Sequence, residues 1–465
     1  MVFSSITFIS VFLPALLLLY YLLPKVCRNY VLLVASLIFY AWGEPVYFFL
    51  LLVSIFINWL AGFLIDRFRG QKGIILLFAI LANIGILGYY KYAGITVETL
   101  NALLRTNFAI PKIALPLGIS FFTFKALSYI VDIYKEECPA QKNILNTALY
   151  ISLFPQLISG PIVKYREMEY QLKDRTHSFD LVIHGLKRFI IGFAKKCLLA
   201  STLGAVADQI FALEPIQISC SLAWLGAFCY SFQLFFDFSG YADMAIGAGE
   251  MFGFKTPENF NYPYISQSIT EFWRRWHISL STWFRDYLYI PLGGNRKGNF
   301  RTYLNLFIVF FTTGLWHGAS WTFVVWGLWH GLFIIIERIT GFHKKEGGWI
   351  LNTIRHIYCM LVVILGWVLF RADNFGFSLK YIATMFGLGG EKDIVFSIPY
   401  FMRNTEWLIM VAAFICSMPI FENLIDKAKS GWKQLILNAW LIILFVLSFM
   451  AMASSTYQPF LYFKF

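Results

Sequence analysis

The stretch FTTGLWHGASWTFVVWGLWHG, residues 311–331, places two histidines in one of the most apolar parts of the chain. His317 and His330 each follow a tryptophan and precede a glycine. An ionisable side chain at membrane depth is costly, and it usually faces the interior of a helical bundle or a water-filled cavity. The meaning of the two histidines therefore depends on whether the surrounding chain is a membrane protein.

The composition of the chain is that of a membrane protein. Hydrophobic residues make up 58% of the 465 residues and charged residues only 14%, whereas a typical soluble domain is about 25% charged. The net charge of +12 comes with no basic low-complexity arm and no nucleic-acid-binding motif. It therefore indicates basic cytoplasmic loops rather than a nucleic-acid partner. We predict an all-α polytopic membrane protein.

Apolar runs separated by short polar breaks recur from one end of the chain to the other. The first run lacks the basic start and the cleavage site of a signal peptide, so we interpret it as a membrane span. Membrane-spanning helices are expected near residues 2–23, 30–43, 46–64, 73–92, 145–162, 180–202, 220–236, 302–316, 320–337, 350–370, 405–421 and 434–453. Apolar pieces at 113–131 and 237–253 are interrupted by Pro, Gly or Asp, and should pack against protein or line a cavity. No linker separates a soluble part, so a single transmembrane domain covering residues 1–465 is predicted.

The distribution of basic residues orients the chain. Lys25 and Arg28 lie in one short loop, and Arg67, Arg69 and Lys72 lie in another, whereas the break at 43–45 has no basic residue. Placing both basic loops in the cytoplasm puts the N-terminus outside. A later basic region should also face the cytoplasm, and it contains Arg274, Arg275, Arg285, Arg296, Lys297 and Arg301.

Residues 267–301, QSITEFWRRWHISLSTWFRDYLYIPLGGNRKGNFR, space their apolar side chains as a helix does. The pattern predicts one amphipathic helix that ends at the glycine-rich, cationic turn PLGGNRKG. His277 falls on the apolar stripe and is expected to be buried. Arg275 follows Glu271 by four residues, the spacing of a stabilising pair on a helix.

Each histidine also has a purely structural explanation, an imidazole packed inside the bundle and bonded to a carbonyl. For His317 the structural and functional explanations are balanced. For His330 packing is favoured, because thirteen residues at 100° each place it on a different helix face from His317. Topology or anionic lipids, rather than substrate, also explain the basic residues.

A second group of polar residues interrupts the apolar run at 231–260. It includes Asp237, Tyr241, Asp243 and Glu250. Acids at this depth suggest a lined cavity or ion pairs with the arginines, and a salt bridge that only holds helices together explains them equally well. The seven scattered cysteines show no metal-binding spacing, so we expect free thiols and no metal site.

Several motifs in order identify a family. They are LPLGISFFTFKALSYIVDIY (115–134), FPQLISGPIVKY (154–165), DFSGYADMAIG (237–247), FWRRWHISLSTWFRDYLYIPLGGNR (272–296), GLWHGASWTFVVWGLWHG (314–331) and GWVLFRADNF (366–375). The opening MVFSS and the terminal PFLYFKF fit the same pattern. The chain resembles the membrane-bound O-acyltransferase superfamily nearly from end to end. Within it, the resemblance is greatest to the bacterial branch that O-acetylates alginate and related exopolysaccharides.

The resemblance implies a helical bundle with re-entrant segments around a central tunnel. The two characteristic histidines of the family correspond to His277 and His317, with His330, Asp237 and Tyr241 in supporting roles. The residues expected to contact substrate are Arg274, Arg275, Trp276, Arg285 and Trp316. With Arg296 and Lys297, the arginines would meet the phosphates of coenzyme A.

The same resemblance implies acetyl-CoA as the acyl donor, with no tightly bound cofactor. It also implies a polysaccharide acceptor, an extracytoplasmic partner of the SGNH-hydrolase type, and a place in the bacterial inner membrane. Transfer of D-alanine or another acyl group to a cell-wall polymer is the alternative within the family, and the identity of the polymer stays open.

The mechanism that the resemblance suggests uses His317 as general base on the acceptor hydroxyl. A covalent acetyl-histidine is the rival. His277 would orient the donor, for example by a hydrogen bond to the thioester carbonyl. Two other classes of protein, a proton-coupled transporter and a scaffold subunit of a polysaccharide export complex, stay open, but the histidine pair and the lack of a sequence repeat favour the enzyme.

Overall fold

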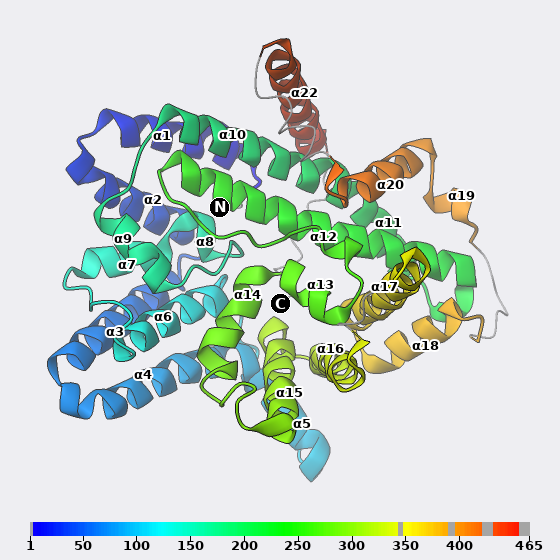
Figure 1. The fold of residues 1–465 in the computed structure, drawn as a ribbon, viewed down its shortest axis with the longest axis horizontal. Coiled ribbons are helices and arrows are strands. Elements are labelled where there is room, and N and C mark those ends of the chain that lie inside the picture. The colour runs from blue at the N-terminus through cyan, green and yellow to red at the C-terminus, as the bar shows by residue number, and fades with distance from the viewer. Residues whose placement is uncertain (1–2, 343–346, 389–395, 421–430, 455–465) are drawn as a thin grey trace. The chain divides into compact units, whose positions relative to one another are not determined.

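The computed structural model describes residues 3–342, 347–388, 396–420 and 431–454, which form helices and loops without a β-strand (Figure 1). Within these ranges, seven helical segments are long and apolar enough to cross a membrane. They are Lys25–Gly43, Phe48–Arg67, Arg69–Leu104, Phe179–Phe211, Trp321–Thr340, Trp349–Arg371 and Trp432–Ser454. The prediction of an all-α polytopic membrane protein is confirmed. The terminal motif PFLYFKF lies outside the described residues.

The chain divides into two compact units, one of Met1–Phe189 and Tyr241–Pro257, the other of Ile190–Gly240 and Glu258–Phe465. Two helices, α10 (Phe179–Ala194) and α12 (Cys220–Met251), contribute residues to both units. The units are therefore not successive along the sequence. One transmembrane domain over residues 1–465 stays a prediction.

The first unit is built mainly from the N-terminal helices. They are α1 (Leu13–Leu22), α2 (Arg28–Gly43), α3 (Phe48–Arg67), α4 (Lys72–Leu87), α5 (Ala93–Leu104), α6 (Ile119–Tyr134), α7 (Ile144–Ser152), α8 (Phe154–Leu157) and α9 (Tyr165–Lys173). Helices α3, α4 and α6 lie side by side (Figure 1). Asn58 of α3 and Asn83 of α4 exchange side-chain hydrogen bonds of 3.0 and 2.8 Å inside this group. Such a pair joins two apolar helices where no water can satisfy an amide.

The second unit carries the two histidine motifs that the sequence singled out. Its helices are α11 (Ser201–Phe211), α13 (Ile269–Arg275), α14 (Ile278–Phe284), α15 (Gly298–His317), α16 (Trp321–Thr340), α17 (Trp349–Arg371), α18 (Phe375–Met385), α19 (Ile398–Phe401), α20 (Asn404–Cys416) and α22 (Trp432–Ser454). Helices α15 and α16 lie side by side, joined by residues 318–320 (Figure 1). The core of this unit is a large cluster of buried aromatic and aliphatic side chains.

Glycines bring α10 and α12 into backbone contact at two points. In the first unit, a Cβ on Gly247 would lie 2.4 Å from the carbonyl oxygen of Gly185. In the second, a Cβ on Gly240 would lie 2.6 Å from the carbonyl oxygen of Gly192. No larger residue fits at such distances, so these glycines set how closely the helices pack.

Two predictions about the helices are wrong. Residues 267–301 are not one helix, because the chain breaks at Trp276 and His277 between α13 and α14. Residues 237–253 are not an interrupted piece, because α12 continues as one helix through Asp237 to Met251. Its acids are paired and its glycines are packed against α10, so neither interrupts it.

Candidate active site

His277 occupies a left-handed backbone conformation, with φ of +44°, in the turn between α13 and α14. This conformation is uncommon for a residue with a Cβ and needs support from its surroundings. The support comes from a neighbouring segment: Ile278 N–H donates to the Asn259 carbonyl at 2.9 Å, and Asn261 N–H donates to the Arg275 carbonyl at 2.9 Å. The predicted burial of His277 is confirmed, since its side chain is 0% exposed.

The hydrogen bonds of Asn259 determine which nitrogen of His277 carries the proton. The Asn259 side-chain oxygen Oδ1 accepts from the backbone N–H and the hydroxyl of Ser279, at 3.2 and 2.8 Å. A backbone N–H can only donate, so the atom facing it is the oxygen. His277 Nδ1 lies 3.1 Å from the same oxygen and therefore donates its proton. In the neutral ring, Nε2 then carries a lone pair.

His277 and His317 come together in the second unit, with ring centroids 6.5 Å apart. His317 is the last residue of α15 and is 5% exposed. Phe238 meets the His277 ring edge-on at 4.7 Å, and Trp316 lies 5.9 Å from the same ring. The two imidazoles thus share a dry aromatic pocket although forty residues separate them in the sequence.

The pentapeptide GLWHG occurs twice, at 314–318 and 327–331, and its glycines let the two helices that carry it touch. A Cβ on Gly314 would lie 2.4 Å from the Phe323 carbonyl oxygen, and a Cβ on Gly327 would lie 2.3 Å from that of Phe310. Only glycine allows the backbones of α15 and α16 this close. The contact places His317 against Trp326 of α16, with ring centroids 4.9 Å apart.

His330 lies on the other side of Trp326, whose ring contacts both histidines. It is fully buried and stacks on Phe272 at 6.2 Å, with Trp273 edge-on at 5.4 Å. Among the described residues, neither of its ring nitrogens has a hydrogen-bond partner. The structure therefore places His330 behind the histidine pair, in the aromatic packing of α13.

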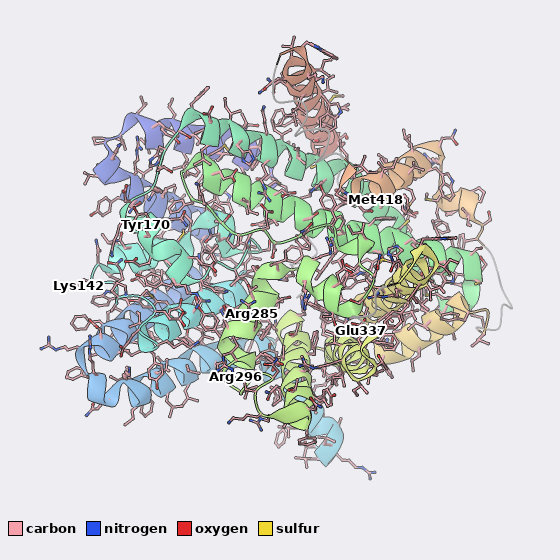
Figure 2. The ribbon with its side chains drawn as sticks, viewed as in Figure 1. Lys142, Tyr170, Arg285, Arg296, Glu337 and Met418 are labelled. Atoms are coloured by element: carbon pink, nitrogen blue, oxygen red, sulfur yellow. The ribbon has the colours of Figure 1, made fainter. Side chains whose placement is uncertain are left out.

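Glu337 of α16, labelled in Figure 2, fixes the start of α13. Its carboxylate accepts from the backbone N–H groups of Ile269 and Thr270 at 2.5 and 2.9 Å, and from the Thr270 hydroxyl at 2.7 Å. A carboxylate at a helix N-terminus binds the unsatisfied N–H groups and complements the helix dipole. Glu337 is 1% exposed, so the anchor is shielded from water.

The acids of α12 pair with bases on α10 and on the π-helix that follows it, η5 (Lys195–Ala200), rather than with the predicted arginines. Asp237 forms a buried ion pair with Lys196 in the second unit. Asp243 pairs with Arg188 at 3.0 Å in the first unit. Tyr241 belongs to the first unit, where its ring packs on Phe3 at 5.1 Å. The suggestion of pairs with the arginines at 274–301 is wrong for both acids.

The predicted substrate-contacting residues have different environments. Arg274 is exposed, Arg275 pairs with Glu271 at 2.9 Å, and Arg285 lies 2.9 Å from Asp286 (Figure 2). The helical pair of Glu271 and Arg275 is thus confirmed. Trp276 and Trp316 are buried in aromatic contacts, and Arg296 and Lys297 are exposed in the turn before α15. Their contact with substrate stays a prediction.

The described part of the chain contains no cluster of three or more His, Cys, Asp or Glu side chains placed to hold a metal ion. All seven cysteines are free thiols. The chemistry available at the site is therefore that of imidazole rings in an aromatic pocket.

The sequence profile of the membrane-bound O-acyltransferase family, MBOAT, matches residues 134–370, just over half of the chain. The match includes both histidines of the pair. The chain belongs to the membrane-bound O-acyltransferase family. It is a multi-pass membrane protein and an O-acyltransferase, as the resemblance predicted.

Three relatives in this family cover most or all of the chain. The probable alginate O-acetylase AlgI of Pseudomonas putida is 41% identical over all of both chains. The protein of the same name from Pseudomonas aeruginosa is 46% identical over 84% of this chain and 75% of its own. The peptidoglycan O-acetyltransferase of Helicobacter pylori is 34% identical over all of this chain and 98% of its own.

Three residues around the pair in this family member were not predicted from the sequence. Asn259 orients His277, Glu337 anchors α13, and Lys196 neutralises Asp237. Only Lys196 carried a local signal, since it is a charged residue inside the apolar stretch 189–200.

Proposed function

We propose that this acyltransferase takes an acetyl group from cytoplasmic acetyl-CoA and transfers it to hydroxyl groups of an extracytoplasmic polysaccharide of the alginate type, or to a partner that completes the transfer. The observation that carries the proposal is the meeting of His277 and His317 in a buried aromatic pocket. The names of the relatives that match most of the chain supply the acetyl group and the polymer class. They favour acetyl transfer over D-alanyl transfer.

In the proposed reaction, a ring nitrogen of His317 accepts the proton of the acceptor hydroxyl. The hydroxyl oxygen attacks the thioester carbonyl, the bond from carbon to sulfur breaks, and the coenzyme A sulfur receives the proton from His317. A placed general base of this kind contributes roughly 10²- to 10⁴-fold to the rate. The aromatic walls exclude the water that would otherwise hydrolyse the thioester.

His277 acts beside this base as a hydrogen-bond acceptor. Its Nδ1 proton is committed to Asn259, and among the described residues its Nε2 has no partner. The lone pair on Nε2 therefore receives a hydrogen bond from a substrate N–H or O–H. A neutral His277 in this tautomer does not donate to the thioester carbonyl, so the orienting role suggested by the family resemblance changes from donor to acceptor.

The cationic surface at residues 274–301 supports a cytoplasmic site for the donor. Arg274, Arg296 and Lys297 are exposed, and guanidinium and ammonium groups are the usual partners of phosphates. The proposal accordingly places the chain in a bacterial inner membrane with its N-terminus outside. An SGNH-hydrolase-like partner would receive the acetyl group on the far side.

The test is release of coenzyme A thiol from acetyl-CoA by the purified full chain in lipid vesicles, with extracytoplasmic extract and polysaccharide supplied. Wild type is compared with His317→Ala and with His184→Ala, a matched control whose side chain is 66% exposed in the first unit. We expect turnover by wild type and by the control, and a loss of about 10²-fold or more in His317→Ala. Equal turnover in wild type and His317→Ala would remove His317 from the mechanism. No turnover in wild type would refute acetyl-CoA as the donor.

A further inference from the structure

The second unit contains an apolar cavity of about 960 Å³ that the proposed reaction does not use. Its walls come from α12, α17 and α20, and its lining includes Phe228, Met360 and Met410, one from each helix. At its inner wall lies Tyr264, whose ring stacks on Trp276, the residue before His277, at 6.3 Å. The cavity thus lies behind the aromatic layer that supports the histidine turn.

Polar groups at the cavity wall are directed into the protein. The Tyr264 hydroxyl donates to the Ser231 carbonyl at 2.6 Å, and Trp224 Nε1 donates to the Met385 carbonyl at 2.7 Å. His356 Nδ1 lies 3.0 Å from the Ser266 carbonyl oxygen, so that nitrogen donates as well. With these donors engaged, the cavity offers an incoming molecule mainly hydrocarbon and aromatic surface.

The cavity runs along a helix that crosses the membrane. Its lining includes His356, Met360 and Ile364, on successive turns of α17, and α17 is one of the membrane-crossing candidates. Around it, α20 presents further apolar surface, with Val411 and Phe414 both more than half exposed. At this depth the surrounding phase is lipid hydrocarbon, so the molecule at hand to fill the cavity is a lipid chain.

The dimensions favour a lipid chain over a helix from another protein. The cavity follows α12 from Ser221 to Phe232, about 16 Å at a rise of 1.5 Å per residue. Its mean cross-section is then about 60 Å², whereas a helix of about 10 Å diameter needs about 80 Å². We propose that this cavity binds an acyl chain of a membrane phospholipid, which lies against Tyr264 and supports the aromatic layer behind His277.

The test is photo-crosslinking with a phosphatidylethanolamine that carries a diazirine on one acyl chain, in vesicles of phosphatidylethanolamine and phosphatidylglycerol. Adducts on the full chain are located by peptide mass spectrometry. We expect enrichment on the peptides of Phe228, Met360 and Met410 over the peptide of Phe78, which is 67% exposed on α4. The double variant Met360→Trp/Met410→Trp fills the cavity and should lose the enrichment. Met450→Trp, at a site 61% exposed on α22, is the matched control and should keep it.

Two further measurements keep the proposal falsifiable should the double variant not fold. Adding phospholipid to delipidated wild type should raise its thermal unfolding midpoint. A photoreactive amino acid at Met410 in cells should give adducts of lipid mass. Lining peptides labelled no more than that of Phe78, or adducts from Met410 to another protein, would overturn the proposal. None of these readouts depends on acyl transfer.

Discussion

For single residues, the chemistry of the site depends on where the proton of His277 lies. Asn259 receives the Nδ1 proton because its oxygen is already fixed by Ser279. The left-handed backbone of His277 directs the ring to this oxygen and to His317. One amide therefore sets both the tautomer and the orientation of a catalytic candidate, as outer partners do for metal-binding histidines.

Replacing Asn259 with Ala should lower acetyl transfer about 10- to 100-fold, the usual cost of losing such an orienting partner. The ring would then be free to adopt the other tautomer, with its lone pair on Nδ1. Thiol release from acetyl-CoA measures the loss, and Asn404→Ala, at an exposed asparagine on α20, is the control. Unchanged turnover in Asn259→Ala would mean that the tautomer of His277 is irrelevant to the reaction.

Burial lowers the pKa of His277 from its ordinary 6.5 to about 3. Between these values the unfolded chain binds a proton that the folded chain does not, so stability falls as pH decreases below about 6.5. The slope contributed by one such group approaches about 1.4 kcal/mol per pH unit. Thermal unfolding of wild type in micelles should therefore lose more stability from pH 7.5 to pH 5 than that of His277→Gln. Identical pH dependence would show that His277 is protonated in the fold.

The sequence indicated which histidines matter but not what holds them. Burial of His277 followed from the apolar stripe, whereas its partner Asn259 is 18 residues away on a segment with no regular pattern. Glu337 is 67 residues from Thr270. Partners chosen by tertiary contact leave no periodic trace, so spacing alone did not reveal them.

Among helices, the pair α15 and α16 decides where His317 stands. The backbones touch at Gly314 and Gly327, and residues 318–320 turn the chain between them. The second GLWHG motif therefore supplies the surface on which the first is positioned. This relation explains the repeated pentapeptide without giving both histidines the same role.

Gly327→Ala should destabilise the protein and reduce turnover. The new methyl group would meet the Phe310 carbonyl oxygen at 2.3 Å and force α15 away from α16. Overpacking of this kind costs about 1–3 kcal/mol. Thermal unfolding and thiol release measure the two effects, with Gly85→Ala on α4, where the methyl group meets nothing within 4 Å, as control. A Gly327→Ala protein as stable and active as the control would show that the close contact is not required.

Loss of the Glu337 anchor should lower kcat while leaving the KM for acetyl-CoA nearly unchanged. Glu337→Ala leaves the N–H groups of Ile269 and Thr270 without an acceptor, at a cost of about 1–3 kcal/mol each if they stay buried. Because α13 leads directly into His277, its displacement moves the ring. Glu337→Gln keeps one acceptor and should recover part of kcat, with exposed Glu98→Gln as control. If kcat stays normal, α13 does not depend on this anchor.

Helical periodicity predicted most membrane helices but gave the wrong answer at 267–301. An apolar stripe continues through α13 and α14 because both short helices bury the same kind of residue. The break between them requires the hydrogen bonds from Asn259 and Asn261, which lie outside the periodic window. At α12 the opposite error occurred, since ion pairs and close glycine packing made a continuous helix of a stretch rich in Asp and Gly.

Across the whole molecule, basic loops and helix order give one consistent orientation. Lys25 and Arg28 stand between α1 and α2, and Arg67, Arg69 and Lys72 stand between α3 and α4. The loop between α2 and α3 has no basic residue. Retention of positive loops in the cytoplasm therefore places both basic loops inside and the N-terminus outside.

Two exposed loop positions test this orientation in intact cells. In a cysteine-free background, Val46→Cys lies in the loop between α2 and α3, at a position 75% exposed. Gly70→Cys lies in the basic loop between α3 and α4, where a Cβ meets nothing within 4 Å. A membrane-impermeant maleimide should label Val46→Cys from outside and label Gly70→Cys only after the membrane is opened. The reverse pattern would place the N-terminus in the cytoplasm, and the exposed cations at residues 274–301 would then need a role other than binding a cytoplasmic donor.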